Sequence, residues 1–457
     1  MTYGTFVFPR KFLHMGGERF KKKEYDIFAP PQNIWQKGSR DDVFTKNYVP
    51  RDKNRTTMTS GKKFRLPLEV IPFHYILEIT PILNNGSKLG EQWTAPGNVK
   101  ILVDCVRVSD SITLHAFLIK FPEDAIKIRD LKTGEKLDVT NHGQSKENED
   151  FYVIKLAKQL QVGHKYEIDI TYIAPVSLRR LDGLYRNQYT DYKTGQTKYL
   201  VSTQFEPYSA RQAFPCFDEP GLKASFDISI GRKAHHISLS NGNLVSSVPM
   251  IRAEKGWIVD TFNTTVKMST YTVAFIVSDY SYTEADSNLF PNRPVRIYGP
   301  KAVIDRGGGE FSANVSARVL AFYEDYFDVP YPMQKMDSVA VPGFPYGAME
   351  NWGLNIYRDR YLIEVPGVTT EALRGTISSI LAHELGFATY YSYIGQNATN
   401  PEFEPMKRLL VDANQFAFRL DSRERSSYPS YLTLIILMSL LTDSLEFRTT
   451  KVQLSFE

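Results

Sequence analysis

The sequence has little cysteine and no long apolar run. Cys105 and Cys216 are its only cysteines, so no disulfide framework can be read from their spacing. Cys105 lies in an alternating apolar run, which suits a buried thiol as well as half of a bridge. The longest largely apolar run, residues 432–441, is about half of the ~20 residues that a membrane-spanning helix needs. We therefore expect no transmembrane segment in this chain.

The sequence also has little net charge, and that charge is uneven. The total is +4, whereas residues 1–64 hold 14 Lys and Arg against 6 Asp and Glu, a net of +8. The basic character therefore belongs to a leader, and the chain as a whole gives no reason to expect nucleic-acid binding. We expect residues 1–64 to be a flexible basic arm. A role at a membrane surface is the alternative, because polybasic segments bind anionic lipid.

Signals for a cellular compartment conflict. The first 30 residues lack the basic and then apolar pattern of a signal peptide. Five Asn-x-Ser/Thr sequons would nevertheless suit a secreted glycoprotein; they begin at Asn54, Asn85, Asn263, Asn314 and Asn397. Extracellular or membrane-associated and cytoplasmic locations both stay open.

Two regions follow the leader. Residues 65–283 repeat short runs of β-branched and aromatic residues with a period of two, among them 75–80, 112–119 and 271–277. Turn signals such as Asn84-Asn85-Gly86 separate these runs, so we predict an antiparallel all-β domain, a sandwich or saddle. Residues 284–457 change to helical spacing, and we predict a mixed α and β domain there.

Two amphipathic helices are expected in the second region. Apolar residues at steps of three and four from Phe311 to Tyr326 predict the first helix, which Pro330 and Pro332 stop. The second helix runs from Thr370 to His383-Glu384. The fold class is therefore α+β with several domains.

Two polar segments stand out before the second helix. The first is 344–354, whose core is Gly347-Ala348-Met349-Glu350-Asn351. A carboxylate among small residues at a strand edge could hold an extended peptide and a charged amine, although such a string can also be a simple turn. The second segment is 203–220, which places Gln204, Glu206 and Arg211 among aromatic residues. It could be a ligand cluster or a buried hydrogen-bonded loop.

The third segment is the helix end at His383-Glu384-Leu385-Gly386-Phe387. In a His-Glu-x-x-His motif, two imidazoles one turn apart hold zinc and the Glu activates a water. Phe387 stands at the second His position. A lone His beside a Glu is most often structural, and one imidazole cannot hold a catalytic zinc, which needs three protein ligands.

Together and in this order, the three segments resemble the aminopeptidase N family of zinc exopeptidases, the gluzincins. The likeness covers residues 65–393. It implies a β-saddle or β-sandwich domain followed by an incomplete thermolysin-like catalytic domain, with zinc as the cofactor and peptides with a free N-terminus as partners. It also implies a role for each matching residue. The substrate-binding residues would be Gln204, Glu206, Gly347, Ala348, Met349, Glu350 and Asn351, with Gln204, Glu206 and Glu350 on the α-amine. His383 would be a zinc ligand and Glu384 the general base.

The chain departs from this family directly after Leu385. The family's third ligand, a Glu, follows the helix after about 18 residues in a string resembling Asn-Glu-Gly-Phe-Ala-x-Tyr. Here Gly386-Phe387-Ala388-Thr389-Tyr390 follows Leu385 at once. The simplest account is that roughly 21 residues are missing at this junction, the second His and the ligand Glu among them. Zinc is then expected to be absent or weakly held, because His383 is the last histidine of the chain.

Three functions follow from these observations. The chain is an active zinc aminopeptidase, a catalytically inactive relative that binds peptides, or a truncated isoform or gene-model product of an active enzyme. The missing ligands favour the inactive forms over the active one. A tail at 448–453 that resembles a frame-shifted remnant of a family string is in keeping with truncation.

Overall fold

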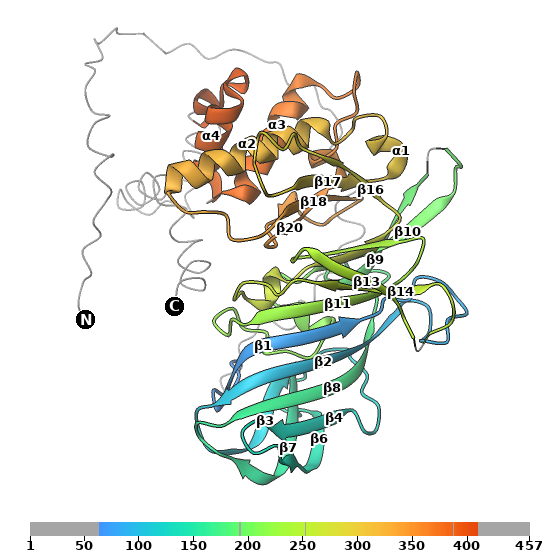
Figure 1. Ribbon diagram of the computed structural model, residues 1–457, viewed down its shortest axis with the longest axis vertical. Helices are drawn as coiled ribbons and strands as arrows, with labels where there is room; N and C mark the ends of the chain where they lie inside the picture. Colours follow the sequence, from blue (N-terminus) through green and yellow to red (C-terminus); the bar gives the residue numbers. More distant parts are fainter. Residues whose placement is uncertain (1–63, 192, 252, 387, 410–457) are drawn as a thin grey trace, which may run out of the picture. The chain divides into compact units, whose positions relative to one another are not determined.

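The computed structural model describes residues 64–409, apart from residues 192, 252 and 387 (Figure 1). The predicted leader up to residue 63, the apolar run 432–441 and the tail 448–453 lie outside the described residues. Within the described part, no helix is both long and apolar enough to cross a bilayer.

A large sheet of eight strands forms the first region. Its inner strands largely alternate fully buried residues with less buried ones, as expected for a sheet with one face on the core. In spatial order the strands are β13 (Leu244–Pro249), β14 (Trp257–Phe262), β11 (Ser225–Lys233), β1 (Val70–Ile79), β2 (Thr94–Cys105), β8 (Lys165–Pro175), β4 (Ile126–Asp130) and β5 (Lys136–Leu137). The predicted antiparallel pairing holds except between β1 and β11, which are parallel. Other strands intervene between these two in sequence, so no hairpin fixes their direction.

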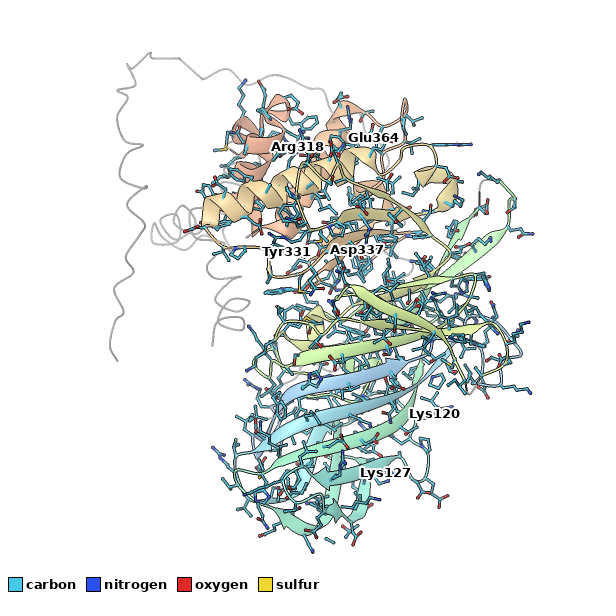
Figure 2. The ribbon with its side chains drawn as sticks, in the orientation of Figure 1. Lys120, Lys127, Arg318, Tyr331, Asp337 and Glu364 are labelled. Atoms are coloured by element: carbon cyan, nitrogen blue, oxygen red, sulfur yellow. The ribbon has the colours of Figure 1, made fainter. Side chains whose placement is uncertain are left out.

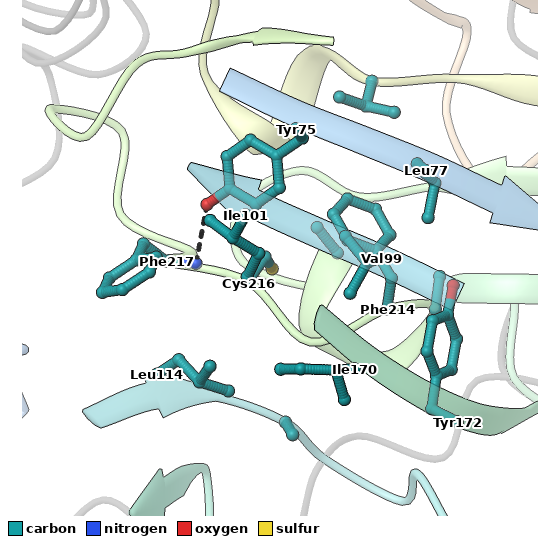
Figure 3. Close-up of a cluster of buried hydrophobic side chains, with 14 of the residues drawn as sticks. Tyr75, Leu77, Val99, Ile101, Leu114, Ile170, Tyr172, Phe214, Cys216 and Phe217 are labelled. Atoms are coloured by element: carbon teal, nitrogen blue, oxygen red, sulfur yellow. Dashed lines mark hydrogen bonds between the residues drawn. The ribbon is translucent and has the colours of Figure 1, made fainter. Parts of the chain in front are cut away.

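A three-stranded sheet packs on this large sheet. Its strands are β3 (Ser109–His115), β7 (Phe151–Leu160) and β6 (Val139–Gln144). The shared core includes Tyr75, Leu114, Phe214 and Cys216 (Figure 3). Tyr75 stacks on Phe226 at 4.7 Å between ring centroids, and its Oη accepts a hydrogen bond from the N–H of Phe217 at 3.1 Å. The loop after β10 thus contributes side chains to this core.

Both cysteines are free and buried. Cys105 lies on β2, and the Cys216 thiol is within the core of Figure 3. Burial raises the pKa of both thiols. Of the two alternatives for Cys105, the buried thiol is therefore the one observed.

A four-stranded sheet completes the first region. Its strands are β12 (Ile237–Ser240), β15 (Phe275–Ser278), β10 (Thr197–Gln204) and β9 (Gly183–Thr190). The strand expected at 271–277 is shorter than its pattern indicated. Residues Thr270–Thr272 form a 3-10 turn, because Thr272 Oγ1 and the backbone N–H of Thr272 both donate to Ser269 O. Local side-chain bonding of this kind competes with a sheet ladder.

A five-stranded mixed sheet organises the second region. Its strands are β16 (Ser281–Glu284), β17 (Val295–Gly299), β18 (Met336–Val341), β20 (Leu354–Arg358) and β19 (Ala348–Met349). The middle three are parallel, and β16 and β19 pair antiparallel at the edges. The domain boundary predicted at residue 283 falls inside β16. The sheet membership of β16 assigns this strand to the second region.

Helices cover one face of the five-stranded sheet, as Figure 1 shows. They are α1 (Lys301–Ile304), α2 (Glu310–Phe327), α3 (Glu371–Leu385) and α4 (Ala388–Thr399). Both predicted helices are confirmed as α2 and α3, and their apolar stripes are buried at Val315, Val319, Ile377 and Leu381. In Figure 2, Arg318 marks α2 and Asp337 marks β18.

The opposite face of this sheet packs on the four-stranded sheet. One apolar cluster joins Leu200 of β10 to Val339, Met349 and Ile356. The edge strand β19 and the strand that ends at Gln204 therefore contribute to the same core layer. The described chain is α+β, as expected, with a mostly β region followed by a helix-containing one.

Candidate substrate and metal site

The predicted peptide-binding string lies on the edge strand β19. Ala348 pairs with Tyr357 and Met349 with Ile356, while Gly347 O accepts a hydrogen bond from the Arg358 N–H at 3.0 Å. In the order of the sheet β19 is terminal. One side of its backbone is thus left unpaired by this sheet, and an extended peptide can pair with such an edge.

Side chains of this string point in two directions. Met349 is buried in the core layer shared with β10, and Ala348 packs against the helical cluster. Gly347 has open space where a side chain would stand. Beyond the strand, Glu350 is half-buried and Asn351 is buried. The segment is therefore a two-residue edge strand followed by a loop, and its role in binding stays a prediction.

Gln204 ends β10 with its side chain almost fully buried, at 2% exposure. Among the described residues, neither its amide nitrogen nor its amide oxygen has a hydrogen-bond partner. Buried amides in proteins are nearly always bonded, so an unmet pair of polar atoms points to a missing partner such as a water or a ligand. Glu206 follows two residues later and is half-buried.

Arg211 and Asp218, by contrast, form an internal network. Arg211 Nε donates to Asp218 Oδ2 at 2.9 Å, and its Nη1 donates to Asp150 Oδ2 at 3.2 Å. Asp218 Oδ1 accepts from Thr270 Oγ1 at 2.6 Å, and the Asp218 N–H donates to His115 Nδ1 at 3.2 Å. For this half of segment 203–220, the buried hydrogen-bonded loop is the alternative observed.

The same network fixes the state of its histidine. Burial, and secondly the Arg211 cation, lower the pKa of His115 to about 2. His115 is therefore neutral at physiological pH, with Nδ1 accepting from Asp218. The loop that follows Gln204 and Glu206 is held by these bonds.

His383 and Glu384 occupy the last turn of α3, and both are half-buried. Asn355 Nδ2 donates to Glu384 O at 3.4 Å. Burial, and secondly the Glu384 carboxylate, raise the pKa of Tyr357 well above its usual value. Tyr357 is the register partner of Ala348 and α3 contacts β19, so the end of α3 and β19 lie together.

The described residues offer no cluster of possible zinc ligands at the end of α3. In the ranges that the structure describes, no three His, Cys, Asp or Glu side chains are close enough to hold a metal ion. After the junction, Glu402 accepts from Asn400 and Glu404 pairs with Lys407, both beyond α4. His383 supplies one of the three ligands that a catalytic zinc needs.

Several residues that build this region carry no motif signal. Nothing in the sequence marks Lys335, Tyr323 or Tyr357, and Asn241 stands in the run Asn241-Gly242-Asn243, which signals only a turn. Among these residues, Lys335 is the most unusual. Its side chain is buried, with 2% exposed, and it lies directly before the buried strand β18. A lysine beside an apolar strand was the available signal, but such a lysine is normally at the surface.

Comparison with known proteins identifies the family. The profile of the peptidase M1 N-terminal domain matches residues 71–272, and that of the peptidase family M1 domain matches residues 311–386. Through these two matches the chain, with its α+β fold, falls in the metallopeptidase class. The chain belongs to the peptidase M1 family of aminopeptidase N-like metalloaminopeptidases.

Curated relatives agree with this assignment. The chain is 32% identical to puromycin-sensitive aminopeptidase of Caenorhabditis elegans over 80% of this chain and 38% of the relative. It is 34% identical to human endoplasmic reticulum aminopeptidase 1 over 75% and 37%. With mouse thyrotropin-releasing hormone-degrading ectoenzyme it shares 29% over 92% and 39%. The chain thus spans about two fifths of the length of these relatives.

Proposed function

We propose that this chain is a member of the M1 family that binds peptides through their free N-terminus and does not hydrolyse them. The junction at Leu385 and Gly386 carries the proposal, because roughly 21 residues with two of three zinc ligands are missing there. The match to the catalytic-domain profile ends at residue 386, which supports a break at this point.

The packing of the helices also supports the deletion, because α3 and α4 close directly on one another. Gln396 Nε2 of α4 donates to Gly375 O of α3 at 2.7 Å, and Ser378 Oγ donates to Asn400 Oδ1 at 3.2 Å. α3 ends at Leu385, α4 begins at Ala388, and the two helices form an antiparallel pair. A connection this short leaves no turn that could carry a second and a third ligand.

The chemistry of the retained residues suits an ammonium group. The carboxylates of Glu206 and Glu350 and the amide oxygen of Gln204 are acceptors for its three N–H donors. The buried, unpartnered amide of Gln204 is the group that gains most from a ligand. The open edge of β19, which ends directly before Glu350, offers backbone partners to the peptide that follows the amine.

The test measures metal, turnover and binding on the purified chain. We expect zinc well below one ion per chain, no hydrolysis of an aminoacyl-anilide above the Glu384→Gln variant, and binding of a peptide with a free N-terminus. The same peptide with an acetylated N-terminus should bind weakly. Glu350→Gln should weaken binding of the free peptide roughly 10- to 100-fold, the loss expected for one charged hydrogen bond.

Glu123→Gln removes an exposed carboxylate of the β region and should leave binding unchanged. Stoichiometric zinc with turnover that depends on Glu384 would overturn the proposal in favour of an active aminopeptidase. Equal affinity for the free and the acetylated peptide would contradict the proposed site for the α-amine. A transcript that restores the stretch between Leu385 and Gly386 would make this chain a shortened form of an enzyme.

A further inference from the structure

The loop between β19 and β20 presents Glu350 and Asn351, and its path is fixed by close backbone contact. Gly353 in this loop has a φ of +77°, and a Cβ there would lie 2.2 Å from Asn241 O. Only glycine fits both the left-handed conformation and the contact. The loop therefore rests directly on the turn after β12, in the four-stranded sheet that also carries Gln204.

Asn241 holds the neighbouring residue of the loop. Its Nδ2 donates to Trp352 O at 2.8 Å and to Thr272 O at 2.9 Å, while its Oδ1 accepts from the Ala274 N–H at 2.9 Å. The side chain is fully buried. Both of its N–H donors are thus used, one of them on the loop, and a shorter side chain could not replace these bonds.

Lys335 holds the next carbonyl of the loop. Its Nζ donates to Gly353 O and to Ser240 O, both at 2.6 Å, and pairs with Asp337 Oδ2 at 2.9 Å. Three partners satisfy the three N–H bonds of the ammonium group. Burial lowers the pKa of Lys335, and the Asp337 carboxylate opposes that shift.

These contacts converge on two successive carbonyls, Trp352 O and Gly353 O. Gly353 O also accepts from the Asp337 N–H at 3.0 Å. A buried ammonium is costly unless its geometry is well satisfied, and an apolar residue of similar volume could fill the space at less cost. Packing alone therefore does not account for a lysine at position 335. A need to hold the loop 350–353 in one conformation does account for it.

We propose that Lys335 and Asn241 are positioning residues that fix the loop 350–353, so that Glu350 meets a peptide amine beside Gln204. The two residues link the loop to the four-stranded sheet. This inference rests on the proposed peptide binding for its functional consequence. Its structural part, the restraint of the loop, can be measured without any ligand.

The first experiment measures the loop itself. Hydrogen exchange by mass spectrometry is followed on the segment 346–357 in the wild type, in Lys335→Met and in Asn241→Ala. Both variants should exchange faster in this segment. Asn187→Ala is the matched control, because Asn187 Nδ2 donates to Pro342 O and links the same two regions away from the loop. Unchanged exchange in both Lys335→Met and Asn241→Ala, or an equal increase in Asn187→Ala, would overturn the proposal.

The second experiment measures binding of a free N-terminal peptide and its acetylated form by titration calorimetry. Lys335→Met should weaken the free peptide at least 10-fold, with Asn187→Ala unchanged. In a chain that already carries Glu350→Gln, adding Lys335→Met should reduce the affinity for the free peptide little further, because Lys335 acts through Glu350. A full additional loss there would overturn the positioning role. Equal binding of the two peptides by the wild-type chain would refute the proposed function. The hydrogen-exchange experiment would still decide whether Lys335 and Asn241 restrain the loop.

Discussion

At the scale of single residues, the chain buries His115 and His236. His115 is 1% exposed, between the Asp218 backbone and the edge of the Phe151 ring, whose centroid is 5.2 Å away. His236 is similarly buried, and its pKa is lowered to about 4 by burial first and then by His235. Such histidines fold in the neutral form and must take up protons when the chain unfolds in acid.

His115 gives a prediction for pH. Its pKa is about 2 in the folded chain and about 6.5 in the unfolded chain, so the unfolded state binds more protons between these values. Its contribution to stability is present above pH 6.5 and is lost as the pH falls. We expect this group to lower the free energy of unfolding by about 2 kcal/mol from pH 7 to pH 5.

Urea unfolding of the wild type and of His115→Gln at both pH values checks this expectation. The variant should be less stable at pH 7 and should lose less stability on acidification. His142→Gln, which replaces a half-buried histidine of β6, is the control. An identical pH dependence in wild type and His115→Gln would contradict the assignment.

At the scale of elements, one tyrosine of α2 holds α3 and α4 together. Tyr323 Oη lies 2.9 Å from Ala382 O and 2.8 Å from Tyr391 O. A hydroxyl donates a single hydrogen, so the two carbonyls share it. The Tyr323 ring also fills the space beside Gly386 and Gly395, where a Cβ would approach its atoms to 2.6 and 2.3 Å.

The junction glycine gives a second prediction. Gly386 has extended backbone angles that any residue can adopt, so a substitution there acts through packing alone. Gly386→Ala should lower the free energy of unfolding by about 1–3 kcal/mol, the usual cost of overpacking. Gly221→Ala is the control, because Gly221 has open space around it and should change stability by less than about 1 kcal/mol. Equal stability of the two variants in urea would show that Tyr323 does not occupy this space.

The predicted end of a helix or strand agrees with the structure where a capping residue in the sequence marks it. The helix expected from Thr370 begins after that residue, whose side chain accepts from the Leu373 N–H at 3.3 Å as an N-cap. The strand expected at 271–277 was shortened, because Ser269 O takes the backbone N–H and hydroxyl of Thr272. A period of two does not reveal such a bond.

At the scale of the whole molecule, the deletion proposed between Leu385 and Gly386 is the feature that separates an active chain from an inactive one. If loss of the deleted stretch removes the zinc site, then returning that stretch should restore metal binding. We predict that inserting the corresponding residues of a relative between Leu385 and Gly386 gives a chain that binds about one zinc ion, because it regains three protein ligands. Elemental analysis after dialysis measures this. An insert in which the His and the Glu are replaced by Ala is the control, and equal zinc in both inserts would contradict the prediction.

Glycosylation stays a prediction at this scale. Of the sequon asparagines that the structure describes, Asn85, Asn314 and Asn397 are exposed, whereas the Asn263 amide donates to Gln334. Accessibility thus permits three of these sites. The sequon at Asn54 lies outside the described residues.

By itself the sequence determined the class of fold, the helix that ends at His383-Glu384, and the junction at Gly386. These are local properties, since a helix follows from apolar spacing and a broken motif from adjacent residues. It also named Gln204, Glu206 and Glu350, whose joint action on an amine remains a proposal.

Only the tertiary structure decided which polar residues are internal. Arg211 and Asp218 belong to a buried network, and Lys335 and Asn241 hold the loop of Glu350. The hydrogen bond from Lys335 to Ser240 O joins residues 95 positions apart, and the bond from Asn241 to Trp352 O joins residues 111 positions apart. The choice of a buried polar partner depends on which distant segments the fold brings together, and no local pattern encodes that choice.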